Sequence, residues 1–252
     1  MKTIGEIKAE FGAAGEKQKR ELCGIYAADP RAGVKALIQK VKKDGEKLEA
    51  ERARIRLMSV YEEKYGDLGL VCGIDEVGRG PLAGPVVAGA VILPRDKEIL
   101  WLNDSKKLSA ARREELYQVI MEEAVAVGLG MAGPARIDEI NILQATYEAM
   151  REAVSNLKTV PQILLNDAVT IPEIIIPQVP IIKGDAKSIS IAAASIVAKV
   201  TRDRMMEEYD QVMPEYDFAS NKGYGSARHI EALKQYGPSP IHRRSFIHNF
   251  VS

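Results

Sequence analysis

The chain has 252 residues, 46% of them hydrophobic, and its 35 Lys and Arg balance 35 Asp and Glu, so the formal net charge is zero. No apolar run approaches the roughly 20 residues that span a bilayer, and the first residues lack the apolar segment of a signal peptide, which predicts a cytoplasmic protein without membrane contact. The two cysteines exclude a disulfide framework and a thiolate metal cage.

The first part of the chain is polar and reads as helical. We predict a helical extension over residues 1–69 that is not part of the main core, and Gly45 interrupts its apolar periodicity. Residues 1–70 carry 15 Lys and Arg against 12 Asp and Glu, a small basic excess.

From Leu70 onward, β-branched runs alternate with helical patterns, which predicts a second domain over residues 70–252. The pattern indicates an α/β fold with a mixed sheet covered by helices. The expected strands and helices, in chain order, are strands 70–77 and 86–93 joined by a constrained loop, helix 109–124, strand 125–132, helix 137–157, strands 162–165 and 180–182, helix 188–212 and helix 226–237.

Carboxylates follow three of the predicted strands. Asp75 and Glu76 end the first strand, where Gly78 and Gly80 permit the break that lets neighbouring residues share a site. Asp167 and Asp185 follow two later strands. A single Asp in such a place is usually a turn former, but four acids at strand ends predict convergence at one sheet edge. Hard oxygen ligands favour Mg²⁺ or Mn²⁺, and four carboxylates suit two ions.

Other polar features have two interpretations each. Lys106, in a polar loop before a helix, is either part of a solvated turn or directed at a phosphate. Tyr224 lies between two glycines. This segment is either a purely structural loop or a loop that presents the tyrosine ring for stacking.

Basic pairs and histidines give weaker signals. The pairs Arg202 with Arg204 and Arg243 with Arg244 are interpreted as solvated surface. The three histidines lack metal-ligand spacing, so a histidine-activated nucleophile has little support.

Several long motifs occur together and in order. They are Gly73–Pro85, Asn103–Leu108, Lys183–Ser188, Ala193–Lys199, Asn221–Gly225 and His242–Phe246. Together they resemble bacterial ribonuclease HII, the type 2 ribonuclease H, over residues 70 to about 247. Asn166 departs from the family's pattern, since an aliphatic residue often precedes the aspartate, but no ligand is lost.

The resemblance implies a ribonuclease H-like fold and a metal-dependent endonuclease. Its expected substrates are RNA/DNA hybrids and duplex DNA with embedded ribonucleotides, cut on the 5′ side to leave 3′-hydroxyl and 5′-phosphate ends, as in ribonucleotide excision and RNA primer removal. A monomer without a small-molecule cofactor is expected. The implied metal-binding catalytic acids are Asp75, Glu76, Asp167 and Asp185.

The resemblance also assigns substrate contacts. Gly78, Arg79 and Gly80 resemble the loop that reads the ribose 2′-hydroxyl. Tyr224 resembles the tyrosine that packs on the adjoining deoxyribose, and Lys106 the lysine that meets the phosphate backbone. The basic excess of the N-terminal extension suggests that it strengthens duplex binding.

Three alternatives stay open at this point. Ribonuclease HIII would be expected to show a different motif after the acid pair and a sheet-containing N-terminal domain. An ATP-hydrolysing relative of actin and sugar kinases would use residues 78–84 as a phosphate loop, but would leave the four acids and Tyr224 unexplained. A non-catalytic module that binds hybrids would tolerate loss of the acids.

Overall fold

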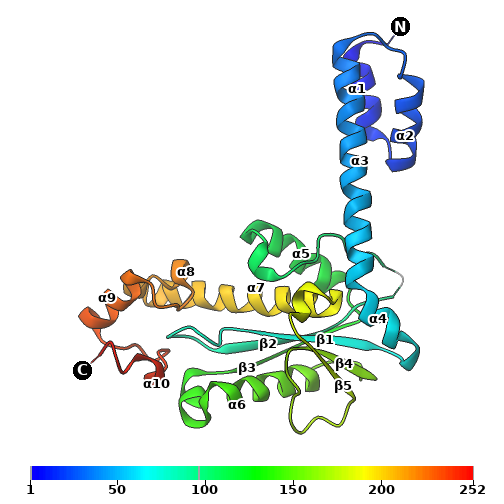
Figure 1. The fold of residues 1–252 in the computed structure, drawn as a ribbon. Coiled ribbons are helices and arrows are strands. Elements are labelled where there is room, and N and C mark those ends of the chain that lie inside the picture. The colour runs from blue at the N-terminus through cyan, green and yellow to red at the C-terminus, as the bar shows by residue number, and fades with distance from the viewer. Residues whose placement is uncertain (1, 96, 252) are drawn as a thin grey trace. The chain divides into compact units, whose positions relative to one another are not determined.

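The structure, a computed structural model, describes residues 2–95 and 97–251. Its internal contacts divide the chain into two compact units, Met1–Arg56 and Leu57–Ser252 (Figure 1). Each unit has a hydrophobic cluster of its own. The structure therefore has a helical N-terminal region and a separate sheet-containing unit, and the two are described in turn.

The first unit consists of α1 (Ile4–Ala13), α2 (Glu16–Ile25) and most of α3 (Ala32–Met58). Thr3 and Glu6 form a reciprocal capping box at the start of α1. Ile7, Phe11 and Val34 are buried in its core. The expected interruption at Gly45 is wrong, because α3 continues through it. One glycine costs a helix only about 1 kcal/mol, which packing can offset.

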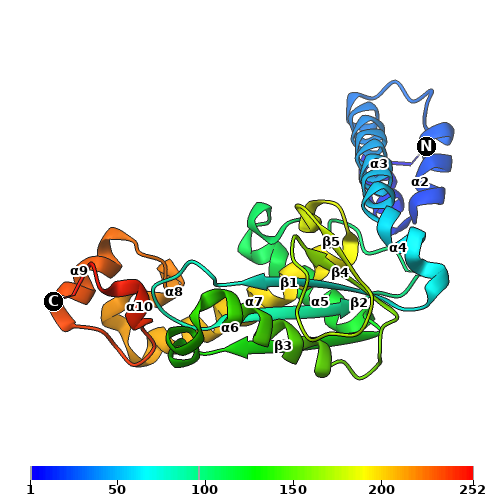
Figure 2. The ribbon, with the colours of Figure 1, turned by 60° about the horizontal axis from the view of Figure 1, so that its bottom comes forward.

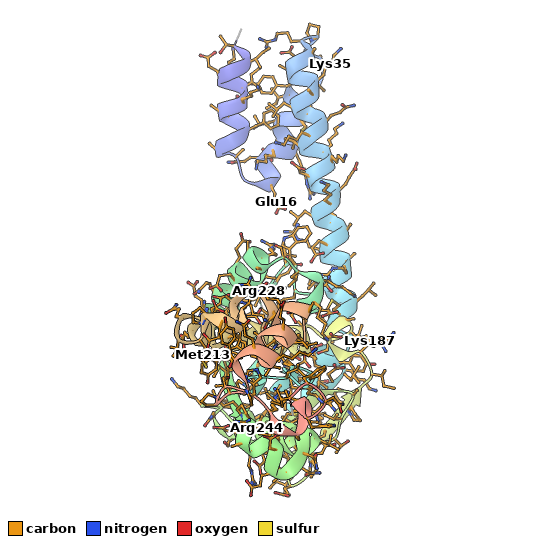
Figure 3. The ribbon with its side chains drawn as sticks, turned by 90° about the vertical axis from the view of Figure 1, so that its left-hand side faces the viewer. Glu16, Lys35, Lys187, Met213, Arg228 and Arg244 are labelled. Carbon is orange, nitrogen blue, oxygen red and sulfur yellow. The ribbon has the colours of Figure 1, made fainter. Side chains whose placement is uncertain are left out.

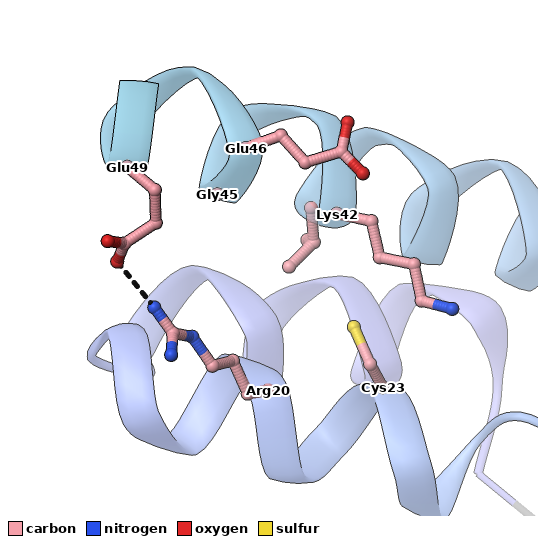
Figure 4. A pocket seen from close by; sticks show the side chains of 7 residues that line it. Arg20, Cys23, Lys42, Gly45, Glu46 and Glu49 are labelled. Carbon is pink, nitrogen blue, oxygen red and sulfur yellow. Dashed lines mark hydrogen bonds and ion pairs between the residues drawn. The ribbon is translucent and has the colours of Figure 1, made fainter. Parts of the chain in front are cut away.

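A cavity of about 530 Å³ lies in this first unit. Arg20 and Glu49 form an ion pair of 2.9 Å across it, from α2 to α3 (Figure 4). None of the residues predicted to be functional lines this cavity.

The second unit is built on a five-stranded mixed sheet of order β3-β2-β1-β4-β5. β1 pairs antiparallel with β2 and parallel with β4, β2 pairs antiparallel with β3, and β4 pairs parallel with β5. The strands are β1 (Val71–Val77), β2 (Val86–Ile92), β3 (Ala126–Ala132), β4 (Ile163–Asp167) and β5 (Gln178–Ile181). The mixed sheet predicted from the sequence is confirmed.

Two long helices cover the opposite faces of this sheet, as Figures 1 and 2 show. They are α6 (Pro134–Ser155), which kinks at Asn141, and α7 (Ile189–Val212). Glycines in the strands let α7 approach closely: a Cβ on Gly73 would lie 2.1 Å from the Ser190 carbonyl carbon, and one on Gly89 would lie 2.6 Å from the Ala194 oxygen. The start and middle of α7 are thereby held directly against β1 and β2.

Shorter helices complete the second unit. They are α4 (Val60–Tyr65), α5 (Ala110–Glu123), α8 (Phe218–Asn221), α9 (Ala227–Tyr236), α10 (Arg244–Ile247) and the 3₁₀ turns Gly66–Leu68, Ser105–Lys107, Gly184–Ala186 and Pro214–Tyr216. Figure 3 looks onto the end formed by the C-terminal helices, where Arg228 of α9 and Arg244 of α10 are labelled.

Several boundaries differ from the sequence prediction by one to three residues, and two of the differences have a clear cause or consequence. β5 is an edge strand that ends at Ile181, so Asp185 lies four residues beyond it in a 3₁₀ turn. Pro180 is accommodated there because an edge strand has one unpaired side. Helix α6 begins three residues early, at Pro134, since proline suits the first helical position. None of the helices among the described residues is long and apolar enough to cross a membrane.

Candidate active site

The sheet places two of the predicted acids on neighbouring strands. β1 and β4 run parallel, with Ile74 opposite Asn166, so Asp75 and Asp167 follow side by side at the next step. Neighbouring strands lie about 5 Å apart, which brings these two side chains to the same edge. The register of β1 and β4 therefore brings Asp75 and Asp167 together at one edge of the sheet.

Asp185 reaches the same edge through a loop. The backbone N–H of Gly184 donates to Asp167 Oδ1 at 2.7 Å, which ties the turn that carries Asp185 to the end of β4. A Cβ on Gly184 would lie 3.4 Å from the Asp167 Cα, so the approach is close. The sequence had placed Asp185 at the end of a strand, whereas in the structure this contact brings it to the sheet edge.

The electrostatics show that the acids influence one another. Asp75 is only 6% exposed, and its pKa is raised by burial and then by the charges of Glu76 and Asp167. Burial also raises the pKa of Glu76, although nearby Arg79 opposes the shift. Burial, followed by the charges of Asp104 and Asp167, raises the pKa of Asp185. Like charges are therefore gathered in a partly dry site.

Lys106 belongs to this acidic group. Partial burial alone would lower the pKa of its ammonium group, but the charges of Asp104, Asp75, Asp185 and Asp167 together raise it. The structure thus places Lys106 beside three of the four predicted acids. Such a lysine neutralises part of the acidic charge and is a point contact for a phosphate.

Asp104 is an acidic neighbour that the sequence analysis did not select. Its carboxyl group lies close to that of Asp185, and its charge contributes to the raised pKa of Asp185. Its own Oδ1 accepts a hydrogen bond from the Lys106 backbone N–H at 2.9 Å. The missed signal was its position one residue before the Ser105–Lys107 turn, where an Asp can cap and still face the site.

The acids have the donor chemistry of a hard-metal site, but they do not form a ready coordination shell. No group of three or more His, Cys, Asp or Glu side chains within the described ranges is arranged to hold a metal ion. Glu76 instead pairs with Arg79 at 3.3 Å, and Asp75 Oδ1 accepts from the Glu76 backbone N–H at 2.8 Å. Their carboxylate oxygens are nevertheless the hard ligands that Mg²⁺ and Mn²⁺ prefer.

Next to the acids, residues 78–85 form a loop whose carbonyl groups point at two buried arginines. Arg243 donates to the carbonyls of Gly78 (2.5 Å), Arg79 (2.9 Å) and Gly84 (2.8 and 2.9 Å). Arg202 donates to Ala83, Pro85 and Lys222, at 2.9–3.0 Å.

Both arginines are fully buried, so the prediction that these basic pairs are solvated surface is wrong for Arg202 and Arg243. Burial lowers the pKa of both, to about 9 for Arg243. The sequence signal for Arg202 was its helical spacing with buried Ala198 and Met206 on α7.

The loop conformation requires glycine at two positions. Gly78 and Gly84 have φ of 89° and 85°, and a Cβ on Gly78 would lie 2.2 Å from Arg202 Nε. The guanidinium group therefore occupies the space that a side chain would need.

Tyr224 lies beside this loop. Its side chain is 47% exposed, and a Cβ on Gly80 would lie 3.7 Å from its ring. The Gly223 carbonyl accepts from the Leu82 N–H at 2.8 Å, which joins the two loops. The structure therefore brings the predicted glycine–arginine motif and Tyr224 together, and Arg79 links them to the acids through Glu76.

The chain matches known protein families along nearly its whole length. The family model "Ribonuclease HII" matches residues 72–249, and the model "Ribonuclease HII N-terminal domain" matches residues 3–66. A curated Ribonuclease HII from Lachnoclostridium phytofermentans is 66% identical over 249 residues, covering 99% of this chain and 98% of the relative.

Solved structures agree on the fold. The ribonuclease H2 of Pyrococcus horikoshii superposes with a TM-score of 0.58 at 32% identity, covering 70% of this chain and 93% of that one. Bst-RNase HIII in complex with Mn²⁺ has a TM-score of 0.53 at 18% identity, covering 66% and 61% of the two chains, a likeness of fold alone.

Proposed function

Because the chain belongs to the ribonuclease HII family and is therefore a ribonuclease H endonuclease, we propose that it cuts RNA/DNA hybrids and also duplex DNA on the 5′ side of an embedded ribonucleotide. The products are a 3′-hydroxyl and a 5′-phosphate. The reaction serves ribonucleotide excision and primer removal in the cytoplasm, carried out by a monomer without a small-molecule cofactor.

The observation that carries this proposal is that the acids lie next to two loops, residues 78–85 and the loop that carries Tyr224. Asp75 and Asp167 are neighbours on parallel strands, and Glu76 pairs with Arg79 of the loop that also approaches Tyr224. A scissile phosphate at the acids would therefore lie close to groups able to read its sugar. This juxtaposition suits recognition of one ribonucleotide in a duplex.

We assign the acids to the metal. Asp75, Glu76, Asp167 and Asp185 would hold Mg²⁺ or Mn²⁺, two ions per site. The ions would supply an activated water and stabilise the leaving oxygen. Burial and the repulsion of neighbouring acids raise the pKa values of Asp75 and Asp185, and bound cations would offset that repulsion. Lys106 would contact the phosphate backbone.

The loops supply the sugar recognition. The backbone of Gly78, Arg79 and Gly80 would bond the ribose 2′-hydroxyl, the group that distinguishes RNA from DNA. Arg243 holds the carbonyl groups of Gly78 and Arg79 by hydrogen bonds, so this loop has little freedom to adapt to a deoxyribose. The exposed Tyr224 ring would pack on the next sugar.

Family membership decides against the ribonuclease HIII and ATP-hydrolysing alternatives. The segment 1–69 is proposed to be an accessory region that strengthens duplex binding through its basic excess. Salt dependence of binding would report such phosphate contacts.

The test is cleavage of a labelled duplex that holds one ribonucleotide, with Mg²⁺, with Mn²⁺ and with chelator, followed by mapping of both ends. We expect metal-dependent cleavage at the 5′ side of the ribonucleotide. Asp75→Asn and Asp185→Asn should abolish cleavage while duplex binding persists, and Asp67→Asn, an exposed site, should leave cleavage unchanged. Full activity in either acid variant would instead favour a different catalytic site.

A further inference from the structure

Two buried histidines form a direct contact that the proposed chemistry does not use. His229 of α9 and His242, just before α10, are 0% and 2% exposed. Their Nε2 atoms lie 2.9 Å apart, within hydrogen-bond distance. One ring must donate and the other accept, so the proton positions can be worked out from the outer ends of the pair.

The backbone groups at the two ends fix the direction of every hydrogen bond. The Ser239 N–H can only donate, and it meets His242 Nδ1 at 2.9 Å, so that nitrogen is an acceptor and the ring proton lies on Nε2. The Tyr224 carbonyl can only accept, and it meets His229 Nδ1 at 2.8 Å, so that nitrogen carries the proton. Therefore His242 Nε2–H donates to His229 Nε2, and both rings are neutral.

The surroundings favour this neutral arrangement. The Tyr216 ring centroid lies 4.9 Å from that of His242, and the Phe218 centroid 5.4 Å from that of His229. Burial, and then the neighbouring His229, lowers the pKa of His242 to about 4, and burial lowers the pKa of His229. A proton added to His229 Nε2 would face the His242 Nε2–H, and a proton added to His242 Nδ1 would face the Ser239 N–H.

The pair connects two separate loops. On one side, the His242 backbone forms a β-bridge with Ala83, and the next residue, Arg243, donates its N–H to the Leu82 carbonyl at 2.9 Å. On the other side, the His229 ring holds the carbonyl of Tyr224. The chain of hydrogen bonds therefore runs from the segment that braces residues 78–85 to the residue that carries the exposed ring.

We propose that His229 and His242 are positioning residues that fix the spacing between the loop 78–85 and Tyr224, and thereby set the enzyme's preference for a ribonucleotide followed by a deoxyribonucleotide. The proposal rests on the function proposed above. Neither histidine touches substrate. Each acts by holding Tyr224 in place beside the loop that we propose reads the ribose.

The first test measures the proton positions in the unmodified full chain. Long-range ¹H–¹⁵N NMR separates the two neutral forms of a histidine ring, and with three histidines the spectrum is simple to assign. At pH 7 we expect His229 protonated at Nδ1 and His242 at Nε2, while exposed His248 serves as reference. The opposite forms, or a charged ring in the pair, would overturn the proposed arrangement.

The second test separates the two links of His229. In His229→Asn the shorter amide can still donate to the Tyr224 carbonyl but does not reach His242. In His229→Gln the longer amide reaches His242 but leaves the carbonyl. The matched control is His248→Asn, and Tyr224→Ala gives the effect of losing the ring. Thermal unfolding confirms that each variant is folded.

The quantity to compare is kcat/KM for a duplex with one ribonucleotide divided by kcat/KM for a uniform RNA/DNA hybrid. We expect His229→Gln to lower this ratio by roughly 3- to 10-fold, the worth of about one hydrogen bond, through KM rather than kcat. His229→Asn should lower it less, and His248→Asn should not change it.

The outcomes are distinguishable. A ratio that stays unchanged in both His229 variants overturns the proposal while leaving the nuclease function intact. An unmodified chain that cuts neither duplex refutes the proposed function. In that case, or if the variants unfold, the NMR result still decides whether the histidine pair holds Tyr224 in the way described.

Discussion

Replacing Asp75 by Asn should make the metal-free protein more stable while it destroys the nuclease site. Asp75 is 6% exposed, and burial, Glu76 and Asp167 raise its pKa. A carboxyl group with a raised pKa in the fold prefers to be neutral there, so its ionised form costs stability at neutral pH. Asn has nearly the same shape and carries no charge.

The size of the gain follows from the register of the strands. Asp75 and Asp167 are side by side on parallel strands, and two like charges roughly 6 Å apart repel by about 3 kcal/mol at an effective dielectric constant of 20. Asn keeps an oxygen to accept from the Glu76 N–H, so little hydrogen bonding is lost. After allowance for imperfect geometry we expect a net gain of about 1–2 kcal/mol, or roughly 2–8 °C in Tm.

The assay is thermal unfolding followed by circular dichroism at pH 7, in chelator and again in Mn²⁺. In chelator Asp75→Asn should unfold at a higher temperature than the unmodified protein, and the gain should shrink as the pH falls and the acids become protonated. In Mn²⁺ the order should reverse, because only the unmodified site gains binding energy. Asp67→Asn is the exposed control. An equal or lower Tm in chelator would refute the claim that repulsion at this edge destabilises the metal-free fold.

Three further changes test other parts of the structure. Arg243→Lys keeps the charge but loses most of the bonds to the loop carbonyls, and should lower the free energy of unfolding in urea by about 2–4 kcal/mol. Glu62→Ala removes the acceptor of the Ser190 N–H and hydroxyl at the start of α7 and should cost about 1–3 kcal/mol, whereas exposed Glu63→Ala should cost less than about 0.5 kcal/mol. The pKa of His242 falls from 6.5 in the unfolded chain to about 4 in the fold, so its contribution to stability should be complete above pH 6.5 and lost between pH 6.5 and 4. A plot of Tm against pH for His242→Gln should lack this step.

The acidic edge could be predicted because strand ends leave a local signature. An apolar run followed by an acid indicates both a strand and its end, as at Asp75 and Asp167, and Gly78 adds a break after the first of them. Parallel pairing then brings such ends together whatever their separation in sequence. Asp185 was predicted for the same site, but the turn that carries it depends on the Gly184 contact with Asp167, which no local pattern specifies.

The buried arginines could not be predicted from charge alone. A basic pair such as Arg243–Arg244 reads as surface, because arginine is rarely buried without a partner. Here the partners of Arg243 are carbonyl groups about 160 residues earlier in the chain. Backbone acceptors carry no sequence signal, so only the folded loop reveals that one arginine of the pair turns inward while the other stays exposed.

Helix α7 contacts both the acidic edge of the sheet and the loop 78–85. The Ser195 side chain lies beside Asp75 and opposes the rise of its pKa, and Arg202, on the same helix, donates to the loop carbonyls of Ala83 and Pro85. Seven residues make about two helical turns and span about 10 Å, so both side chains face the sheet. The acids and the loop 78–85 are therefore both supported by one helix, which packs directly on Gly73 and Gly89. The loop that we propose to read the ribose 2′-hydroxyl is thereby supported by the same helix as the acids.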